Sequence, residues 1–297
     1  MCDFSEYRGS SDEWLAIEPT LPKNATPSSV DEIVSLRNAV NRGREEEAAK
    51  VMGSLGDSIV TDDFSIPTQD GQQIRARTYK ARHVSEALPV YVHLHGGGFL
   101  FGSLSSEDAT CARIALDAQV LVLNVCYRHT PEHTYPTAWN DVEDAFKWLE
   151  DNVSAIGGDP HQVVLGGISA GAWLTASHLL NTTQPITLNI RGQVLMIPSL
   201  VYYECYAPQK AQLLSPEVSS YVQNKDAPIL PADRMILFSD LLKVANPKED
   251  DLRLNPGNAS SSQVQHLPPT VFGVAGMDML RDEALLYAKL LHEAGYV

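Results

Sequence analysis

The stretch Val163–Gly171 (VVLGGISAG) decides the fold of this 297-residue chain. Its apolar start is typical of a strand buried on both faces, and the helix-forming run Ala170–Leu180 follows. Between them, Gly167-Ile168-Ser169-Ala170-Gly171 matches the pattern G-x-S-x-G. A sharp strand-to-helix turn of this kind lifts a serine hydroxyl above the sheet, and larger residues two positions either side would clash. Ser169 is therefore a candidate nucleophile, and the alternative is a Gly/Ser turn used only for helix–sheet packing.

Short apolar runs alternate with helical patterns on both sides of this stretch. Further strands are predicted at Pro89–His95, Val120–Val125, Gln193–Ile197 and Thr270–Ala275. Helices are predicted over residues 106–118, 138–151, 170–180 and 280–294. This alternation predicts the fold class α/β, with a mostly parallel sheet and helices on both of its faces. Two shorter runs, 59–66 and 73–80, predict a hairpin because they flank the turn sequence Thr68–Gly71.

We divide the chain into an N-terminal arm and cap helix (1–55), a first core part (56–198), a cap insertion (199–268) and a last core part (269–297). The polar residues 1–29 predict an irregular arm, and apolar spacing predicts a helix over Asp31–Met52. The insertion is rich in Tyr, Pro and Ser, with a helix near 231–244. We expect it to pack with the N-terminal helix over the C-terminal edge of the sheet, where open α/β sheets bind ligands.

The segment His95-Gly96-Gly97-Gly98-Phe99 follows directly on a predicted strand. Three successive glycines leave backbone N–H groups open to a substrate oxygen, and such donors stabilise the charge that develops on a carbonyl oxygen in acyl transfer. A flexible glycine turn is the alternative interpretation. We interpret His95 as an anchor of this loop, because it precedes Ser169 whereas the triad order in this fold is Ser, acid, His.

The charge balance limits the partners of the chain. It has 22 Lys+Arg and 37 Asp+Glu, a formal net charge of −15, which argues against binding to nucleic acid or anionic lipid. No stretch approaches the roughly 20 apolar residues that cross a bilayer, and the N-terminus lacks the pattern of a signal peptide. The four cysteines are scattered, which favours free thiols in a reducing compartment. We expect a cytoplasmic protein without membrane insertion or a nucleic-acid partner.

Five blocks of the sequence together resemble the hormone-sensitive-lipase-like esterases of the α/β-hydrolase superfamily. They are His95–Phe99, Tyr127–Asp141, Gly158–Pro160, Gly167–Gly171 and Ala275–Glu283. The resemblance implies an α/β-hydrolase fold whose cap is built from the N-terminal helix and the insertion. It also implies that Ser169 is the nucleophile, that Asp278 is the triad acid, and that the amides of Gly97, Gly98 and Ala170 form the oxyanion hole, with His95 and Gly96 supporting the loop.

Other residues near these motifs have weaker roles in this interpretation. Ile168 stands where the family usually has an acidic residue, which changes local polarity but removes no catalytic group. Asp282 and Glu283 are rivals of Asp278, but they fall inside the next predicted helix, where we expect them to cap the helix or to face water. Four tyrosines of the insertion are candidates for the cap, with ordinary packing as the alternative: Tyr202, Tyr203, Tyr206 and Tyr221.

The general base of a Ser–His–Asp mechanism has no candidate in this sequence. The family supplies a histidine after the acid, on a loop that follows one more strand. His292 lies well inside the last predicted helix, on the order of 15–20 Å from its start at 1.5 Å per residue. His266 precedes the Thr270–Ala275 strand, so it belongs at the opposite edge of the sheet from the site.

Two explanations of the missing base are open. In the first, the chain continues in the natural protein with a strand, the histidine loop and a last helix; Gly295 resembles a helix C-cap, and Tyr296-Val297 the start of a strand. Alternatively the chain is complete and catalytically silent, similar to hydrolase-derived hormone receptors. In either case the pocket remains a small-molecule site.

We therefore expect a serine hydrolase that cleaves carboxylic esters of small or medium acyl groups, with a possible role in small-molecule metabolism. The expected partner is a small-molecule ester, no metal or organic cofactor is implied, and the chain is expected to be a monomer or homodimer. A silent ligand-binding protein is the alternative. A purely structural module is the weakest interpretation, because a scaffold needs neither the serine turn Gly167–Gly171 nor the glycine loop His95–Phe99.

Overall fold

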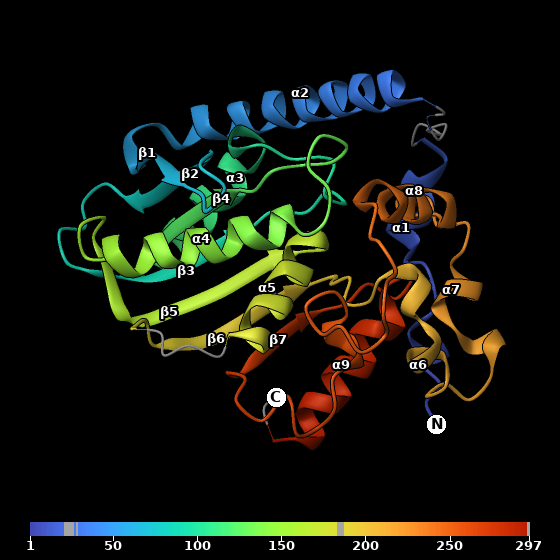
Figure 1. Cartoon of the computed structure of the whole chain (residues 1–297). Helices are drawn as coiled ribbons and strands as arrows, with labels where there is room; N and C mark the ends of the chain where they lie inside the picture. Colours follow the sequence, from blue (N-terminus) through green and yellow to red (C-terminus); the bar gives the residue numbers. More distant parts are fainter. Residues whose placement is uncertain (21–26, 28, 183–186, 296–297) are drawn as a thin grey trace.

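Within the residues that the computed structural model describes (1–20, 27, 29–182 and 187–295), seven strands form one sheet in the order β1-β2-β4-β3-β5-β6-β7 (Figure 1). They are β1 (Ile59–Pro67), β2 (Gln73–Ala81), β3 (Leu88–Leu94), β4 (Leu121–Cys126), β5 (Gly158–Ile168), β6 (Ile190–Met196) and β7 (Thr270–Gly273). The pairs β1–β2 and β2–β4 are antiparallel, and the other pairs are parallel. The predicted α/β-hydrolase fold, with a mostly parallel sheet and a hairpin before it, is confirmed.

Strand β4 shows why its sequence is apolar without alternation. Leu121, Leu123 and Val125 join the main core cluster on one face of the sheet. Val122 points to the opposite face and packs against Cys111. Both faces are buried, so apolar side chains occupy consecutive positions, and the polar residue of the strand, Asn124, is buried as well.

Helices cover both faces of the sheet (Figure 1). They are α3 (Leu104–Asp117), α4 (Thr137–Asn152), α5 (Ala170–Asn181) and α9 (Arg281–Glu293). Side chains of α3 pack in the cluster with Val122, whereas those of α4 and α5 belong to the main cluster on the other face. The helix predictions are therefore confirmed, with boundaries that shift by a few residues.

The N-terminal segment is more ordered than predicted. Residues 12–17 form a short helix, α1 (Asp12–Ile17), whose first turn is capped by the Ser11 hydroxyl accepting from the Trp14 amide at 3.2 Å. The prediction of an irregular arm is wrong there, because Ser followed by two acidic residues is a favourable helix start that composition alone does not reveal. Residues 21–26 and 28 of the predicted arm lie outside the described residues.

The predicted helix over residues 31–52 is confirmed as α2 (Val30–Leu55). Its first half joins a cluster with Phe101 and with Leu241 of the insertion. Its second half packs on the α3 side of the sheet through Met52 and Leu55. A paired ion contact, Arg37 to Glu132 at 2.6 and 2.7 Å, holds α2 against the loop between β4 and α4.

The insertion contains three α-helices within its described residues: α6 (Ala207–Lys210), α7 (Ser220–Gln223) and α8 (Ala232–Leu242). The last of these confirms the helix predicted near 231–244, and it reaches over Gly98 through Phe238. The chain then returns to the core, where the indole N–H groups of Trp139 and Trp173 donate to the carbonyls of Arg253 and Leu254. The insertion therefore combines a cap helix with a segment that packs on α4 and α5.

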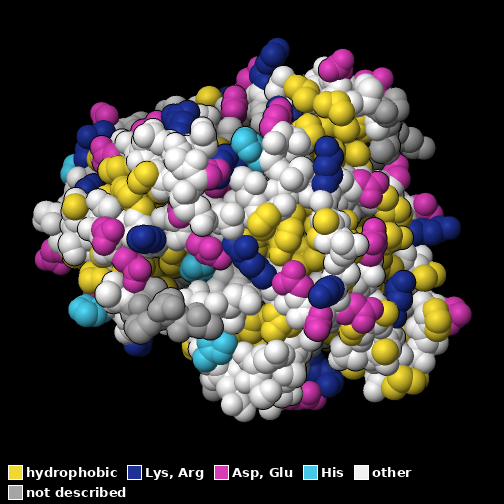
Figure 2. Space-filling view, viewed as in Figure 1, with side chains coloured by type: hydrophobic (Ala, Val, Ile, Leu, Met, Phe, Trp, Pro, Cys, Tyr) yellow, Lys and Arg dark blue, Asp and Glu magenta, His cyan; other side chains and the backbone are white. Residues whose placement is uncertain are grey.

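No helix among the described residues is long and apolar enough to cross a membrane. On the face shown in Figure 2, Asp and Glu side chains lie between Lys and Arg side chains throughout. The predicted strand start at Tyr296-Val297 lies outside the described residues.

Candidate active site

Ser169 lies on the turn between β5 and α5 in a backbone conformation that few residues other than glycine adopt. Its φ is 54° and its ψ is −113°, and such a conformation persists only where the surrounding structure imposes it. The Ser169 amide donates to the Met196 carbonyl at 2.8 Å, and the Ser169 carbonyl accepts from Trp173 at 3.0 Å. The turn is thus held from both sides, as a nucleophile elbow requires.

The two glycines of the elbow have no space for a side chain. A Cβ on Gly167 would lie 2.3 Å from the carbonyl carbon of Gly171. A Cβ on Gly171 would lie 2.0 Å from the carbonyl oxygen of Leu94, at the end of β3. The close approach of α5 to β3 and β5 therefore requires glycine at both positions. This is the steric reason that the sequence analysis gave for the pattern G-x-S-x-G.

The glycine loop after β3 presents backbone amides beside Ser169. Gly97 and Gly98 have φ values of 132° and 61°, which glycine adopts without strain. Within the described residues, the amides of Gly97, Gly98 and Ala170 donate to no other group. Unbonded amides of this kind, next to a serine and lining a cavity, are suited to an anionic oxygen.

His95 lies beneath the loop and is completely buried. Its ring stacks on Tyr127 at 4.3 Å between centroids, and its Nδ1 lies 3.0 Å from the Gly96 carbonyl. The Tyr127 hydroxyl donates to the His95 carbonyl at 2.7 Å, and burial lowers the pKa of the His95 imidazole. These contacts place His95 outside the cavity and fit the role of a loop anchor.

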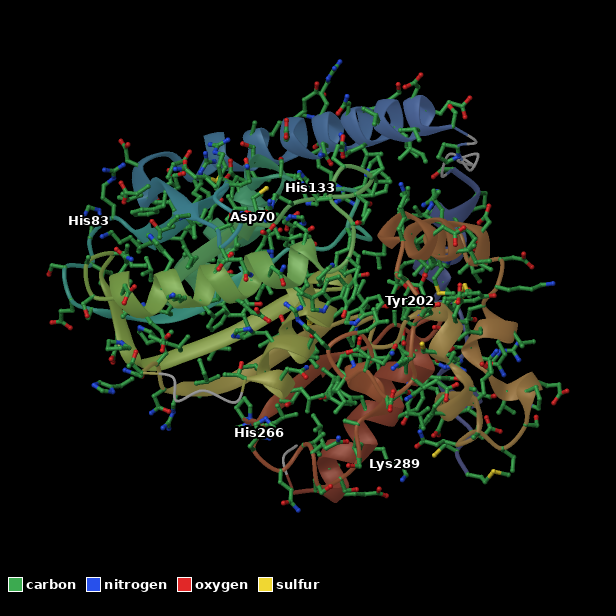
Figure 3. The ribbon with its side chains drawn as sticks, viewed as in Figure 1. Asp70, His83, His133, Tyr202, His266 and Lys289 are labelled. Carbon is green, nitrogen blue, oxygen red and sulfur yellow. The ribbon has the colours of Figure 1, made fainter. Side chains whose placement is uncertain are left out.

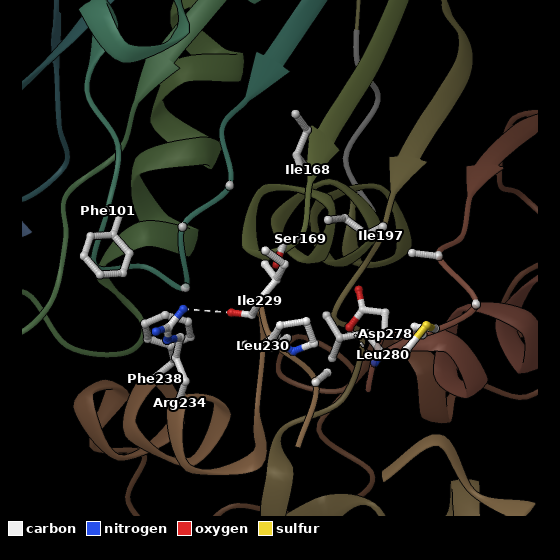
Figure 4. Close-up of a pocket in the computed structure, with 18 of the residues that line it drawn as sticks. Phe101, Ile168, Ser169, Ile197, Ile229, Leu230, Arg234, Phe238, Asp278 and Leu280 are labelled. Atoms are coloured by element: carbon white, nitrogen blue, oxygen red, sulfur yellow. Dashed lines mark hydrogen bonds between the residues drawn. The ribbon is translucent and has the colours of Figure 1, made fainter. Parts of the chain in front are cut away.

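A cavity of about 740 Å³ joins Ser169, the glycine loop and Asp278. Figure 4 shows Phe238 and Arg234 of α8 on one side of Ser169 and Asp278 on the other. The lining is mainly apolar and comes from α1, α2, α3, the glycine loop, the insertion and the loop between β7 and α9. Its large apolar residues are Trp14, Phe101, Ile168, Ile197, Ile229, Leu230, Phe238, Met277 and Leu280. Volume and lining are those of a small-molecule site.

Asp278 stands on the loop between β7 and α9, facing this cavity. Its Oδ1 accepts from the Leu280 amide at 3.0 Å, and burial raises the pKa of its carboxyl above the ordinary value. The loop is tied to α7 and its C-cap residue: the Ser220 hydroxyl donates to the Met279 carbonyl at 2.6 Å, and the Asn224 side-chain amide donates to the Asp278 carbonyl at 2.8 Å. The insertion therefore fixes the position of Asp278.

Asp282 and Glu283 do not line the cavity with Ser169. Both are completely buried in the first turn of α9. Asp282 accepts from the Ser220 amide at 2.7 Å and from Arg281 at 2.8 Å. The prediction that these residues face water is wrong, because α7 covers the start of α9 and Arg281 neutralises Asp282 there.

Replacing Asp278 by asparagine is expected to stabilise the protein at pH 7 and to change nothing at pH 3. The raised carboxyl pKa means that the folded state binds the proton more tightly than the unfolded state. The Asp278 contribution therefore becomes less favourable as pH rises from about 4 through the folded-state pKa, and the penalty persists above it. Urea unfolding at both pH values tests this, with the exposed Asp226→Asn as control. Equal stability of Asp278→Asn and parent at pH 7 would contradict it.

None of the nine histidines, all of which lie in the described ranges, lines this cavity. His292 is exposed on α9. His266 contacts the Leu179 carbonyl at 3.2 Å, near the end of α5 that is remote from Ser169. Figure 3 shows His83 and His266 far from cap helix α8. Ser169 and Asp278 thus share a cavity to which no described histidine contributes.

The four tyrosines predicted as cap candidates do not line the cavity. Tyr206 and Tyr221 pack against each other at 3.9 Å between ring centroids, which favours the packing interpretation. Sequence reasoning missed Trp14, Arg234 and Phe238, which do line it. The spacing of Met235, Phe238 and Leu242 along the predicted helix was the available signal, since it marks one apolar face.

The comparisons with known proteins agree with this geometry. The model of a family described as alpha/beta hydrolase fold matches residues 91–297. Carboxylesterase NlhH of Mycobacterium tuberculosis is 34% identical over 226 residues, which make up 75% of this chain and 66% of that protein. Esterase LipI of the same organism is 32% identical over 211 residues, 70% of this chain and 61% of the relative. The solved structure of vibralactone cyclase has a TM-score of 0.84 at 25% identity, covering 96% of this chain and 83% of that one.

The matched stretch thus spans about two thirds or less of the two curated relatives. The family model nevertheless covers the glycine loop, the serine elbow and the acid loop in one continuous match. The chain is similar to these two esterases, and it belongs to the alpha/beta hydrolase fold family, in its hormone-sensitive-lipase-like group.

Proposed function

We propose that the protein is a serine hydrolase that cleaves carboxylic esters of small or medium acyl groups. The observation that carries the proposal is the position of Ser169, on a strained turn at a cavity wall beside three unbonded amides. A turn that serves only helix–sheet packing does not need a strained backbone, a cavity and unbonded amides at the same place. The names of the two curated relatives, a carboxylesterase and an esterase, support the same chemistry.

In this proposal the Ser169 Oγ attacks the ester carbonyl carbon, and a general base takes the hydroxyl proton. The carbonyl oxygen becomes an oxyanion held by the amides of Gly97, Gly98 and Ala170. The base returns the proton to the departing alcohol, which leaves an acyl group on Ser169. Water then attacks this acyl-enzyme by the same steps and releases the carboxylic acid. Asp278 would orient this base. The base would be a histidine, and none of the histidines in the described residues lies at the site.

A silent ligand-binding protein is the second candidate, and one observation favours it. None of the nine histidines of the chain lines the cavity, so the described residues supply no histidine to accept the Ser169 proton. The cavity would still enclose a small apolar ligand. The two candidates differ in whether Ser169 reacts.

Labelling with a fluorophosphonate is expected to modify Ser169 stoichiometrically, because this reagent mimics the tetrahedral intermediate and needs an activated serine in an oxyanion hole. Intact mass gives the stoichiometry, and peptide mass spectrometry locates the label. Protein unfolded in urea is the control and should remain unlabelled. Labelling of several serines, or of none in a folded protein that binds phenyl acetate by calorimetry, would favour the silent ligand-binding protein.

A further inference from the structure

The cavity at Ser169 contains a guanidinium group without an acidic partner. Arg234 lines the cavity from α8 and is partly buried. Its Nη1 donates to the Ile229 carbonyl at 2.8 Å, which engages one of the five N–H donors of a guanidinium. No carboxylate of the described residues forms an ion pair with Arg234, so its charge and its other donors face the cavity.

Arg234 differs in this respect from the other arginines that the fold withdraws from water. Within the described ranges, every other partly or fully buried arginine forms an ion pair with Asp or Glu: Arg37, Arg77, Arg128, Arg253 and Arg281. Such pairing is the rule because a charge that is withdrawn from water without a partner costs free energy. A bound molecule with a negative charge would supply the partner that Arg234 lacks.

A second guanidinium lies at the same end of the cavity. The Arg44 Cζ is 5.9 Å from the centroid of the Phe101 ring. The Phe101 and Phe238 rings are in turn 5.9 Å apart between centroids, and Phe238 stands one helical turn after Arg234 on α8. All four residues line the cavity. Two positive charges therefore flank one aromatic pair.

The two carboxylates of the cavity lining do not pair with these cations. Asp278 lies on the other side of Ser169 from Arg234 (Figure 4). Glu107 is buried on α3, where its Oε2 lies 3.2 Å from the Nε2 of His93. Since the whole chain has a formal net charge of −15, a positive end of the cavity is a local feature of the site.

The shape and surroundings of the Arg234 side chain favour a carboxylate as the bound anion. A guanidinium donates two parallel N–H groups to the two oxygens of a carboxylate. The cavity is otherwise mainly apolar, and a doubly charged phosphate would lose more hydration there than a singly charged carboxylate. A small apolar molecule that ends in a carboxylate matches both the walls and the cation.

We infer that Arg234 binds a free carboxylate of the substrate, so that the substrate is an ester that also carries a carboxylate group in its acid or its alcohol part. This inference rests on the proposed hydrolase function, whose substrate class it specifies. Arg234 acts in it as a residue that determines specificity, and Arg44 adds positive charge at the same end of the cavity.

The test uses two pairs of esters in which a carboxylate is either free or methylated. p-Nitrophenyl hydrogen adipate and p-nitrophenyl methyl adipate carry the group in the acid part. 4-Acetoxybenzoate and methyl 4-acetoxybenzoate carry it in the alcohol part. Hydrolysis of the aryl ester bond is followed in all four. The parent is expected to favour the charged ester at least about tenfold in kcat/KM in one pair. The pair with this preference identifies the part of the substrate that holds the carboxylate.

Arg234→Gln should reduce this preference at least about tenfold, because the amide keeps a donor but loses the charge. Arg234→Lys should retain part of it. Arg42→Gln is the matched control, because Arg42 is exposed on the same helix as Arg44 and does not line the cavity; its preference should stay within about twofold of the parent. Equal preferences in the parent and Arg234→Gln for both pairs, or the same decrease in Arg42→Gln, would overturn the inference and leave the proposed function standing.

A chain that hydrolyses no ester would count against the proposed function alone, and a binding measurement then tests the inference. In a Ser169→Ala background, calorimetry with phenyl hydrogen adipate and with 4-acetoxybenzoate should show binding of at least one of them. Arg234→Gln should weaken that binding at least about tenfold, and Arg42→Gln should change it less than about twofold. Binding that is equal in all three proteins, or undetectable in all, would overturn the inference.

Discussion

Replacing Ser169 by alanine is expected to lower kcat/KM for p-nitrophenyl acetate by at least about 10³-fold, while the melting temperature changes little. The Ser169 hydroxyl faces the cavity and makes no helix-cap hydrogen bond, so its removal leaves the elbow held by backbone contacts. Ester hydrolysis would lose its nucleophile and, with it, the acyl-enzyme route. Steady-state kinetics and thermal unfolding measure the two effects.

The size of this loss also reports on the general base. Members of a catalytic triad act as a unit, and removing the nucleophile or the base costs about as much as removing all three. If a base assists Ser169, alanine therefore causes nearly the full loss. If no base acts there, the parent is already slow and alanine changes little. A decrease below about tenfold would favour the silent ligand-binding protein.

Ser54→Ala provides the control for the same chemical change. Ser54 is exposed near the end of α2 and does not line the cavity at Ser169. Its variant should keep kcat/KM within about twofold of the parent. A comparable loss in Ser54→Ala would mean that the assay reports folding or expression rather than chemistry at the site.

The fold could be predicted from the sequence because its local signals agree with one another. The run Leu121–Leu123 of β4 is apolar without alternation since both faces of the strand are buried. The elbow could be predicted because Gly167 and Gly171 have no room for a Cβ, a steric demand that leaves a visible pattern.

The walls of the site could not be predicted in the same way. Phe238 packs on Gly98 although they are far apart in the chain, and no local pattern encodes that contact. Trp14 lines the cavity from a helix that the sequence presented as part of a polar arm. Long-range placement of cap residues depends on the packing of the whole insertion, which a single sequence does not specify.

At the start of α9, the acidic residues Asp282 and Glu283 led to a wrong prediction from the sequence, namely that they face water. Acidic residues in a first helical turn usually face water and favour the helix dipole. Here Asp282 is buried, because Arg281 is buried beside it and donates to it at 2.8 Å. The Arg281 guanidinium also donates to the Gly276 carbonyl at 3.4 Å and to Gln223 of α7 at 3.1 Å. One cation therefore connects the acid loop, α9 and the cap.

Replacing Arg281 by methionine is accordingly expected to cost about 3–5 kcal/mol of unfolding free energy, because the Asp282 carboxylate would remain buried without its cation. Arg75→Met, at an exposed pair with Asp63, should cost less than about 1 kcal/mol and serves as the control. Adding Asp282→Leu to Arg281→Met should recover part of the loss, since the uncompensated charge disappears while the Ser220 amide loses its acceptor. A single-variant loss as small as that of the control, measured by urea unfolding, would mean that the buried pair does not hold the acid loop, and that the hydrogen bonds of Ser220 and Asn224 suffice to position Asp278.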